Sequence, residues 1–256
     1  MENVLNRAHG LQPGQIKRVE PGAPLRWLSR GWSDMQKTPL TSIAYGLVFA
    51  VLGYLLVSAL ADLPWIAAAL MTGFLIVGPF LAIGLYQLSR RIEEAGDASP
   101  RDALTAWRHH GWSTVSFGIF LLLAMVIWLQ VSMWITALAY HGMSPNLTAI
   151  YTEASISVET FVFLAAFVVV GGLIAALVYV ASVVTLPMLH DRDTDLLSSV
   201  ATSLAAVRTN PKPLILWAVL IVVLTAVGML LVFVGLAVTM PLVGHASWHA
   251  YRDLVA

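Results

Sequence analysis

One uncharged stretch, residues 215–244, restricts the fold of this chain more than any other feature. It contains no Asp, Glu, Lys, Arg, His, Asn or Gln. Because an α-helix rises about 1.5 Å per residue, about 20 such residues cross a bilayer core roughly 30 Å thick. The stretch is therefore longer than one membrane span. It is long enough for two spans only if the following residues, 245–252, belong to the second.

The composition of the whole chain points to the same environment. Hydrophobic residues make up 59% and charged residues 11%, and the mean hydropathy is +0.81. A soluble domain carries about 25% charged residues, so most of this surface is expected to meet lipid. The zero net charge gives no footprint for a nucleic-acid partner. The chain has no Cys and therefore no disulfide. Its polar first 20 residues do not suggest a cleaved signal peptide.

The hydrophobic pattern predicts an all-α, polytopic membrane helix bundle. We expect six transmembrane helices arranged as three hairpins, together with short cytoplasmic amphipathic helices and a flexible cytoplasmic tail over residues 1–23. Residues 24–256 would form a single transmembrane domain. The expected spans lie near residues 40–61, 65–88, 114–140, 158–184, 213–233 and 236–254, and the expected interfacial helices near residues 24–37, 100–110 and 194–208. The alternative is five spans, with the last apolar run crossing once.

The first amphipathic segment follows residue 24, where Pro suits the first turn of a helix. Its expected apolar face consists of Leu25, Trp27, Leu28, Trp32 and Met35. Its expected polar face consists of Arg26, Arg30, Asp34 and Lys37. This pattern is typical of a helix that lies in the membrane interface. Ser99 before Pro100 is expected to cap the second such helix, and Asp193 or Thr194 the third.

The charge distribution predicts the topology. With six spans, all 14 Lys and Arg residues fall on one side of the membrane. The positive-inside rule then places both termini in the cytoplasm. The second helix of each expected hairpin carries one proline (Pro79, Pro187 or Pro241), which we predict to kink or hinge the helix. An interfacial helix followed by a hairpin would form a three-fold internal repeat, although any protein with an even number of spans and polar loops shows a similar pattern.

Several sequence stretches carry a family resemblance. They are Gly78-Pro79-Phe80, Gly84-Leu85-Tyr86, Ser89-Arg90-Arg91, Leu186-Pro187-Met188, Asp191-Arg192-Asp193 and residues 241–252. Over nearly the whole chain after residue 20, the sequence resembles bacterial integral membrane proteins catalogued as domain of unknown function 2189. His190 departs from the aliphatic residue expected before Asp191. The resemblance implies a bacterial inner-membrane location and no established activity.

His245 and His249 are the sharpest candidates for chemistry. Four residues apart on a helix, they share one face, which is the spacing of a two-ligand metal site. A zinc or copper site would need a third ligand, for which His109, His110, Asp191 and Asp193 are candidates. The alternative is that both imidazoles bond backbone carbonyls or lipid phosphates at headgroup level. One helix cannot supply both axial ligands of the same haem, and we predict no cofactor.

The polar segments are expected to form a cytoplasmic interface. Its candidate residues are Arg90, Arg91, Asp191, Arg192, Asp193, Tyr251 and Arg252. Basic residues near an anionic leaflet contribute roughly 1 kcal/mol each to membrane association. The residues from Asp191 to Asp193 are also read as a helix cap and solvated loop.

The expected spans contain almost no ionisable group, whereas proton pumps and many ion-coupled transporters need such groups. We therefore expect a non-enzymatic accessory, assembly or scaffold subunit of a larger membrane complex, with a respiratory complex as one candidate. Its expected partners are membrane lipids and other integral membrane proteins. Two alternatives stay open. One is a carrier of a lipid or apolar solute, and the other is metal or haem handling through the two histidines.

Overall fold

The computed structural model describes residues 16–60, 64–106, 111–140 and 157–255, and these residues form helices without a strand. In chain order the helices are α2 (Ala23–Lys37), α3 (Pro39–Ala59), α4 (Pro64–Leu81), α5 (Ile83–Ala95), α6 (Pro100–Thr105), α7 (Trp112–Ala139), α9 (Val158–Ser182), α10 (Thr185–Asp191), α11 (Leu196–Thr209), α12 (Pro211–Leu230) and α13 (Leu236–Leu254). The prediction of an all-α protein is confirmed.

Five helical segments within the described residues are long and apolar enough to cross a bilayer. They are Pro39–Ala59, Ile66–Ala95, Trp112–Ala139, Val158–Asp191 and Pro211–Leu230. The sixth predicted span does form a helix, α13, at the predicted residues, but it is not among these five. Its second half carries His245, His249 and Arg252, which lower its hydropathy. The structure thus supports five candidate spans and does not confirm six, nor the three-fold repeat.

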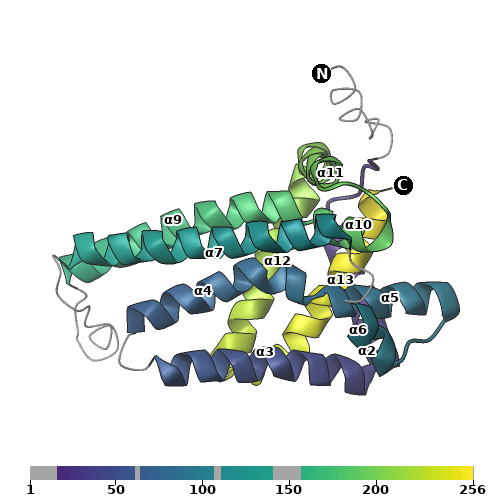
Figure 1. The fold of residues 1–256 in the computed structure, drawn as a ribbon, viewed down its shortest axis with the longest axis horizontal. Helices are drawn as coiled ribbons and strands as arrows, with labels where there is room; N and C mark the ends of the chain where they lie inside the picture. Colours follow the sequence, from purple (N-terminus) through teal and green to yellow (C-terminus); the bar gives the residue numbers. More distant parts are fainter. Residues whose placement is uncertain (1–15, 61–63, 107–110, 141–156, 256) are drawn as a thin grey trace.

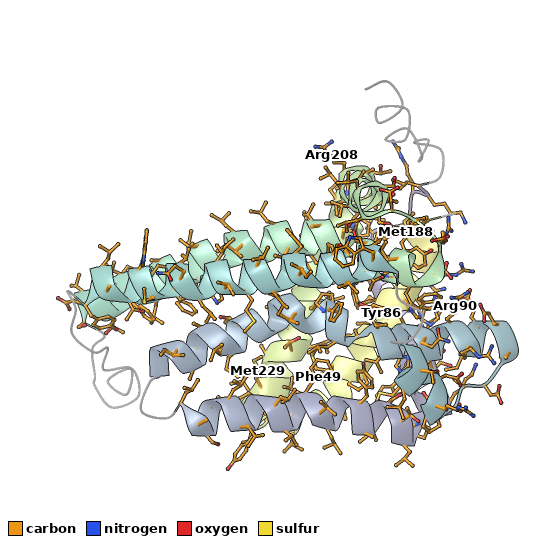
Figure 2. All side chains as sticks on the ribbon, viewed as in Figure 1. Phe49, Tyr86, Arg90, Met188, Arg208 and Met229 are labelled. Atoms are coloured by element: carbon orange, nitrogen blue, oxygen red, sulfur yellow. The ribbon has the colours of Figure 1, made fainter. Side chains whose placement is uncertain are left out.

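The helices are arranged so that the molecule has two different ends (Figure 1). Helices α3, α4, α7 and α9 run alongside one another, and their ends near Ala59, Pro64, Ala139 and Val158 lie at one end, here called the distal end. Helices α2, α5, α6, α10 and α11 gather with the C-terminal part of α13 at the other end, here called the polar end. Figure 2 shows the nitrogen- and oxygen-bearing side chains concentrated at the polar end. This segregation of charge fits a membrane protein with one charged face.

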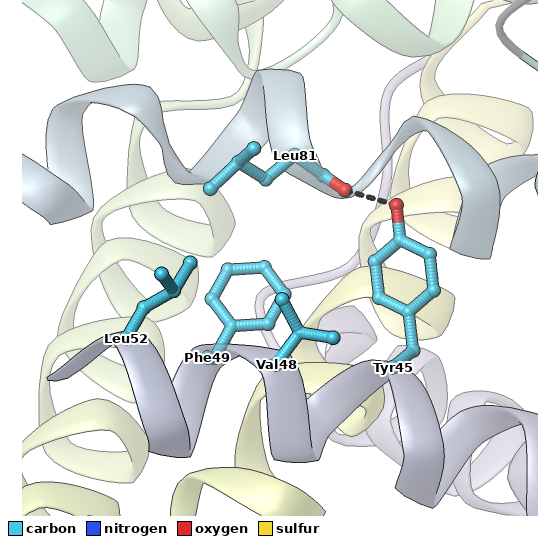
Figure 3. Close-up of a pocket in the computed structure, with 5 residues that line it drawn as sticks. All are labelled: Tyr45, Val48, Phe49, Leu52 and Leu81. Carbon is cyan, nitrogen blue, oxygen red and sulfur yellow. Dashed lines mark hydrogen bonds between the residues drawn. The ribbon is translucent and has the colours of Figure 1, made fainter. Parts of the chain in front are cut away.

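Proline interrupts the second candidate span as predicted. Pro79 has no N–H, and the chain breaks between α4 and α5 at Ala82, whose N–H bonds to the carbonyl of Gly78 at 3.0 Å. The N–H of Leu85 then bonds to the carbonyl of Ala82 and not to that of Leu81, so the Leu81 carbonyl does not accept this helical hydrogen bond. The hydroxyl of Tyr45 in α3 donates a hydrogen bond to this carbonyl (Figure 3). The kink is therefore fixed by a bond to the neighbouring span.

A second break separates α9 from α10 near Val184, ahead of Pro187. Here Ser203 of α11 completes the interrupted backbone. Its hydroxyl donates to the carbonyl of Val180 at 2.7 Å and accepts from the N–H of Val184 at 3.3 Å. Pro241, by contrast, lies inside α13 without a break at its position. Two of the three predicted proline sites therefore adjoin helix breaks, and their use as hinges stays a prediction.

The prediction for the faces of α2 was wrong in one respect. Asp34 was assigned to the exposed polar face, but it is only 5% exposed and lies on the buried face of α2 together with Trp27 and Gly31. Leu25 and Trp32 lie on the outer side and are 60% and 46% exposed. The reason is that α2 packs closely against α13: a Cβ at Gly31 would lie 2.7 Å from the backbone N of Ala246. Helix α2 therefore has one face inside and a second, narrower apolar face outside.

The caps of the short helices are only partly as predicted. Ser99 forms a capping box with Asp102 at the start of α6, as expected. Helix α11, however, is capped by Asp195, which accepts from the N–H of Ser198 at 2.9 Å. The predicted caps Asp193 and Thr194 were therefore wrong, because the helix begins only at Leu196, directly after Asp195.

The predicted N-terminal tail lies partly outside the described residues, which begin at Ile16. From there the chain is attached to the polar end. Lys17 donates its N–H to the Leu254 carbonyl at 2.9 Å, and Val19 donates to the Asn210 side chain at 2.9 Å. Residues 16–23 of the predicted flexible tail are therefore bonded to the rest of the protein at these points.

Candidate functional site

Helix α13 is held at the polar end by a buried cluster of polar side chains. Asp34 of α2, Ser42 of α3 and Ser89 of α5 surround His245 and His249 of α13, and each of these five residues is at most 9% exposed. Small residues permit this close packing. A Cβ at Gly244 would lie 2.5 Å from the Leu85 side chain, and Gly31 is equally crowded. We refer to these five residues as the buried polar cluster.

His245 is bonded through both ring nitrogens. Its Nδ1 lies 2.8 Å from Ser89 Oγ, and its Nε2 lies 3.0 Å from Ser42 Oγ. Ser89 also donates its single hydroxyl proton to Asp34 Oδ2 at 2.7 Å. Ser89 must therefore accept from His245, which places a proton on Nδ1. A neutral ring then accepts at Nε2 from the Ser42 hydroxyl. Each hydrogen bond from Ser42 through His245 and Ser89 to Asp34 thus has one donor and one acceptor.

His249 meets the same carboxylate. Its Nε2 lies 2.8 Å from Asp34 Oδ2, so one oxygen of Asp34 accepts from both Ser89 and His249. Burial on its own would raise the pKa of the Asp34 carboxyl, but the hydrogen bonds from His249 and Ser89 outweigh it, and the pKa lies below its usual value. Asp34 is therefore a carboxylate that anchors α13 to α2 and α5.

The cluster forms one continuous hydrogen-bonded chain from Ser42 to His249. Chemically it can hold a charge away from water, and it can move a proton between its members through hydroxyl rotation. Its clearest structural effect is to join four helices at a point where apolar contact alone would not fix their register. Buried, fully bonded polar groups specify one arrangement because any other leaves a group unpaired.

A second cluster, at the surface of the polar end, contains most of the predicted interface residues. Asp191 accepts from the hydroxyl of Tyr251 at 2.7 Å. Arginine nitrogens approach it at 3.6 to 3.8 Å, from Arg90, Arg192 and Arg252. Nearby Glu93 accepts from Arg252 at 3.2 Å and from Trp248 at 3.0 Å. This ionic cluster connects α5, α10 and α13.

The two remaining predicted interface residues lie beside this ionic cluster. Arg91 approaches Glu94 at 3.8 Å and Asp102 at 3.6 Å, so it connects α5 to α6. Asp193 lines a polar cavity of about 270 Å³ between the start of α7 and the chain after α10, with His190 and Thr194 in the same wall. The predicted interface residues thus lie near one another at the polar end, in pairs that the sequence did not indicate, and their role as a cytoplasmic interface stays a prediction.

The predicted metal ligands are found in a different setting. Among the described residues, no group of three His, Asp or Glu side chains has the arrangement of a metal site. The rings of His245 and His249 bond to serines and to Asp34. Asp191 bonds to Tyr251, and His109 and His110 lie outside the described residues. Metal binding through the two histidines stays a prediction.

Sequence reasoning missed Asp34, Ser42 and Ser89 as partners of these histidines. Ser42 and Ser89 are isolated hydroxyls in apolar or mixed surroundings, which carry no pattern of their own. Asp34 could have been found: with Trp27 and Gly31 it follows a helical i, i+4, i+7 spacing, and the glycine in that row indicates close contact with another helix.

The fold and the charge segregation define a class: this is a multi-pass α-helical integral membrane protein. Residues 66–191 match the family model described as predicted integral membrane protein (DUF2189). The match runs from α4 to α10 and confirms the resemblance seen in the sequence, but the resembling residues 241–252 lie beyond it. No curated protein and no solved structure matches the chain.

Proposed function

We propose that this protein is a non-catalytic accessory or scaffold subunit of a larger complex in a bacterial inner membrane. The observation that carries the proposal is the surface of α9. In the apolar 18-residue stretch that marks Val158–Asp191 as a candidate span, only 11% of the residues are buried, compared with 28% to 44% in the corresponding stretches of the other four candidate spans. A helix with so little intramolecular contact has most of its circumference available to another membrane protein.

The outer face of α9 has the composition of a helix–helix contact. Ala165, Val169, Gly172 and Ala176 follow helical spacing and are all exposed. A Cβ at Gly172 would meet nothing within 4 Å, whereas one at Gly171 would lie 2.7 Å from the Trp128 ring. Gly171 thus packs against Trp128 inside the protein, whereas Gly172 faces outward with no neighbour at its Cβ position. Small residues in such a row let two helix backbones approach closely in lipid.

The proposed architecture has three hairpins, the last formed by α12 and α13, so that both termini lie at the polar end. Because the basic residues gather there, we place this end in the cytoplasm. The turn before α3 at Thr38 (φ −126°, ψ 51°) and the turn before α12 at Asn210 (φ −127°, ψ 54°) have the same conformation. This correspondence supports the repeated unit; the third junction lies outside the described residues.

The carrier alternative receives less support. The apolar cavity in Figure 3, between Tyr45, Val48, Phe49, Leu52 and Leu81, has a volume of about 200 Å³. Ligand pockets usually have volumes of about 300–1,000 Å³, so this cavity is too small for a whole lipid.

Copurification from membranes in a mild detergent tests the proposal. We expect the wild-type protein to elute with stoichiometric partners, and Gly172→Trp to lose them. Val126→Trp is the matched control, because Val126 is an exposed residue (59%) on the neighbouring α7. A wild-type protein that always elutes alone as a monomer would contradict the scaffold role. Partners retained by Gly172→Trp would contradict the use of this face of α9.

A further inference from the structure

The turn between α12 and α13 has properties that an aqueous loop would not have. Its five residues, Leu231-Val232-Phe233-Val234-Gly235, include no polar side chain. Leu231, Val232 and Val234 are 60%, 68% and 68% exposed, and the preceding Leu230 is 83% exposed. Four neighbouring large aliphatic side chains thus point away from the protein at the tip of this hairpin.

The position of the tip along α3 shows its depth. Phe233 packs against Gly53, where a Cβ would lie 2.8 Å from the Phe233 ring, and Ala237 packs against Gly46. With 21 residues, α3 is about 31 Å long and matches the thickness of a bilayer core. Gly53 lies about 9 Å before the distal end of α3 at Ala59. The tip is therefore level with the interior of a membrane-spanning helix and not with its end.

The figures agree with this depth. Figure 1 shows α12 and α13 steeply inclined to α3, and their connection lies beside the middle part of α3 instead of at the distal end with the ends of α3, α4, α7 and α9. On α3 itself, Val51, Leu52 and Leu55 at this level are 54%, 41% and 54% exposed and face outward as lipid-facing residues do.

Several backbone N–H groups of the turn are bonded within the protein, which is what a place in hydrocarbon requires of polar groups. The N–H groups of Leu231, Phe233 and Val234 bond to carbonyls of Val227, Met229 and Leu231 at 3.1 to 3.2 Å. Those of Leu236 and Ala237 bond back to Phe233 and Val234 at 2.9 and 3.1 Å. The turn thus closes on itself and does not depend on water for these groups.

The turn is also unusually tight. Val232 and Phe233 adopt φ values of 53° and 64°, in the left-handed region that branched and aromatic residues rarely occupy. The helices nearly touch on either side of the turn: a Cβ at Gly235 would lie 2.8 Å from the Gly228 backbone. Such a strained conformation persists only where the surrounding structure holds it, here the close contact of the two helices.

From these observations we propose that α12 and α13 form a re-entrant hairpin. It enters the membrane from the polar end, and the side chains of residues 230–234 contact the acyl chains inside the bilayer without reaching the opposite aqueous surface. This inference rests on the membrane class of the protein and not on its proposed role as a scaffold.

Single-cysteine labelling tests the proposal directly, because the chain has no Cys and each variant carries one thiol. We would introduce Val232→Cys and Val234→Cys at the tip, Val51→Cys at the same level on α3, and Leu138→Cys near the distal end of α7, where the residue is 78% exposed. The protein would be reconstituted in sealed phosphatidylethanolamine–phosphatidylglycerol vesicles. A charged, impermeant maleimide would then be applied to each side, since the reactive thiolate forms only in contact with water.

We expect Leu138→Cys to react from one side within minutes. Both tip variants and Val51→Cys should react from neither side, at rates at least 10-fold slower, and all four should react after unfolding in detergent. A tip thiol that reacts as fast as Leu138→Cys, from either side, would overturn the proposal. Using two tip positions keeps the test valid if the strained Val232 position does not tolerate replacement.

A nitroxide attached at the same thiols identifies what covers the tip. Contact with lipid predicts strong relaxation by oxygen and weak relaxation by a water-soluble nickel chelate, with a ratio within about two-fold of that at Val51→Cys. Weak relaxation by both reagents would mean that protein, such as a second copy of the chain, covers the tip. That result would overturn contact with acyl chains.

Discussion

Asp34 in α2 and His249 in α13 are separated by 215 positions in the sequence, yet Asp34 Oδ2 and His249 Nε2 lie 2.8 Å apart in a buried setting. At the polar end, this contact joins the first amphipathic helix to the last helix of the chain. The same carboxylate oxygen accepts from Ser89, which in turn contacts His245. The C-terminal helix is thus fixed by specific bonds and not by apolar packing alone.

Asp34→Asn should destabilise the protein, because it leaves His249 without its anionic partner in a buried place. Losing a hydrogen bond to a charged group costs about 1.5–3 kcal/mol, and we expect a value near the lower limit because an amide still accepts one hydrogen bond. The free energy of unfolding in mixed detergent micelles is the measurement. Glu20→Gln is the matched control: Glu20 pairs with Arg26 at the surface, where its side chain is 76% exposed, and a loss below about 1 kcal/mol is expected.

The contribution of Asp34 should depend on pH in one direction. Its pKa in the folded protein lies below the usual 3.8, so the carboxylate stabilises the fold above pH 3.8 and loses this effect as the pH falls through the folded value. The difference in unfolding free energy between wild type and Asp34→Asn should therefore be largest near neutral pH and shrink below about pH 4. A difference that stays constant between pH 7 and pH 3 would show that the charge of Asp34 is not involved.

Ser89→Ala should cost more than Ser42→Ala. Ser89 bonds to both Asp34 and His245, whereas Ser42 bonds to His245 and to the nearby Thr38. An unsatisfied buried polar group costs about 1–3 kcal/mol. Ser89→Ala removes a bond from both Asp34 and His245, whereas after Ser42→Ala the Thr38 hydroxyl keeps its bond to the Asp34 carbonyl and only His245 is left short of a partner. A double-mutant cycle of Ser89→Ala with His245→Ala should give a coupling energy of about 0.5–3 kcal/mol. Strict additivity would contradict the bond between the two side chains.

Gly46→Ala should separate α13 from α3. A Cβ at this position would lie only 2.3 Å from the carbonyl oxygen of Ala237, and a backbone atom cannot move aside without shifting the helix. Overpacking of this kind typically costs about 1–3 kcal/mol. Gly172→Ala is the control, since nothing lies within 4 Å of its Cβ position. Equal unfolding temperatures for the two variants would argue against the close contact between α3 and α13.

The sequence allowed the helices to be predicted, because long apolar runs and proline breaks follow from local physics. The predicted segment at residues 158–184 corresponds to α9 (Val158–Ser182), and the predicted final segment at residues 236–254 corresponds to α13. The partners of the two histidines could not be predicted in the same way. His245 lies 203 positions from Ser42 and 156 from Ser89, and nothing in the local sequence of either serine indicates such a partner.

The same limit explains the error for Asp34. A carboxylate on an amphipathic helix is usually solvated, and only the contact between α2 and α13 gives it a buried face. The depth of the turn after α12 was also hidden, since an apolar run of that length is compatible with crossing the membrane or with folding back inside it.

Asp34 and His249 join α2 to α13. The most direct test of this arrangement is to determine on which side of the membrane each of these two helices ends. Lys37→Cys, at the end of α2, and Arg252→Cys, near the end of α13, would be labelled with an impermeant maleimide in intact and inverted vesicles. We expect both thiols to react from the same side and Leu138→Cys to react from the other. Labelling of Arg252→Cys together with Leu138→Cys would contradict this arrangement.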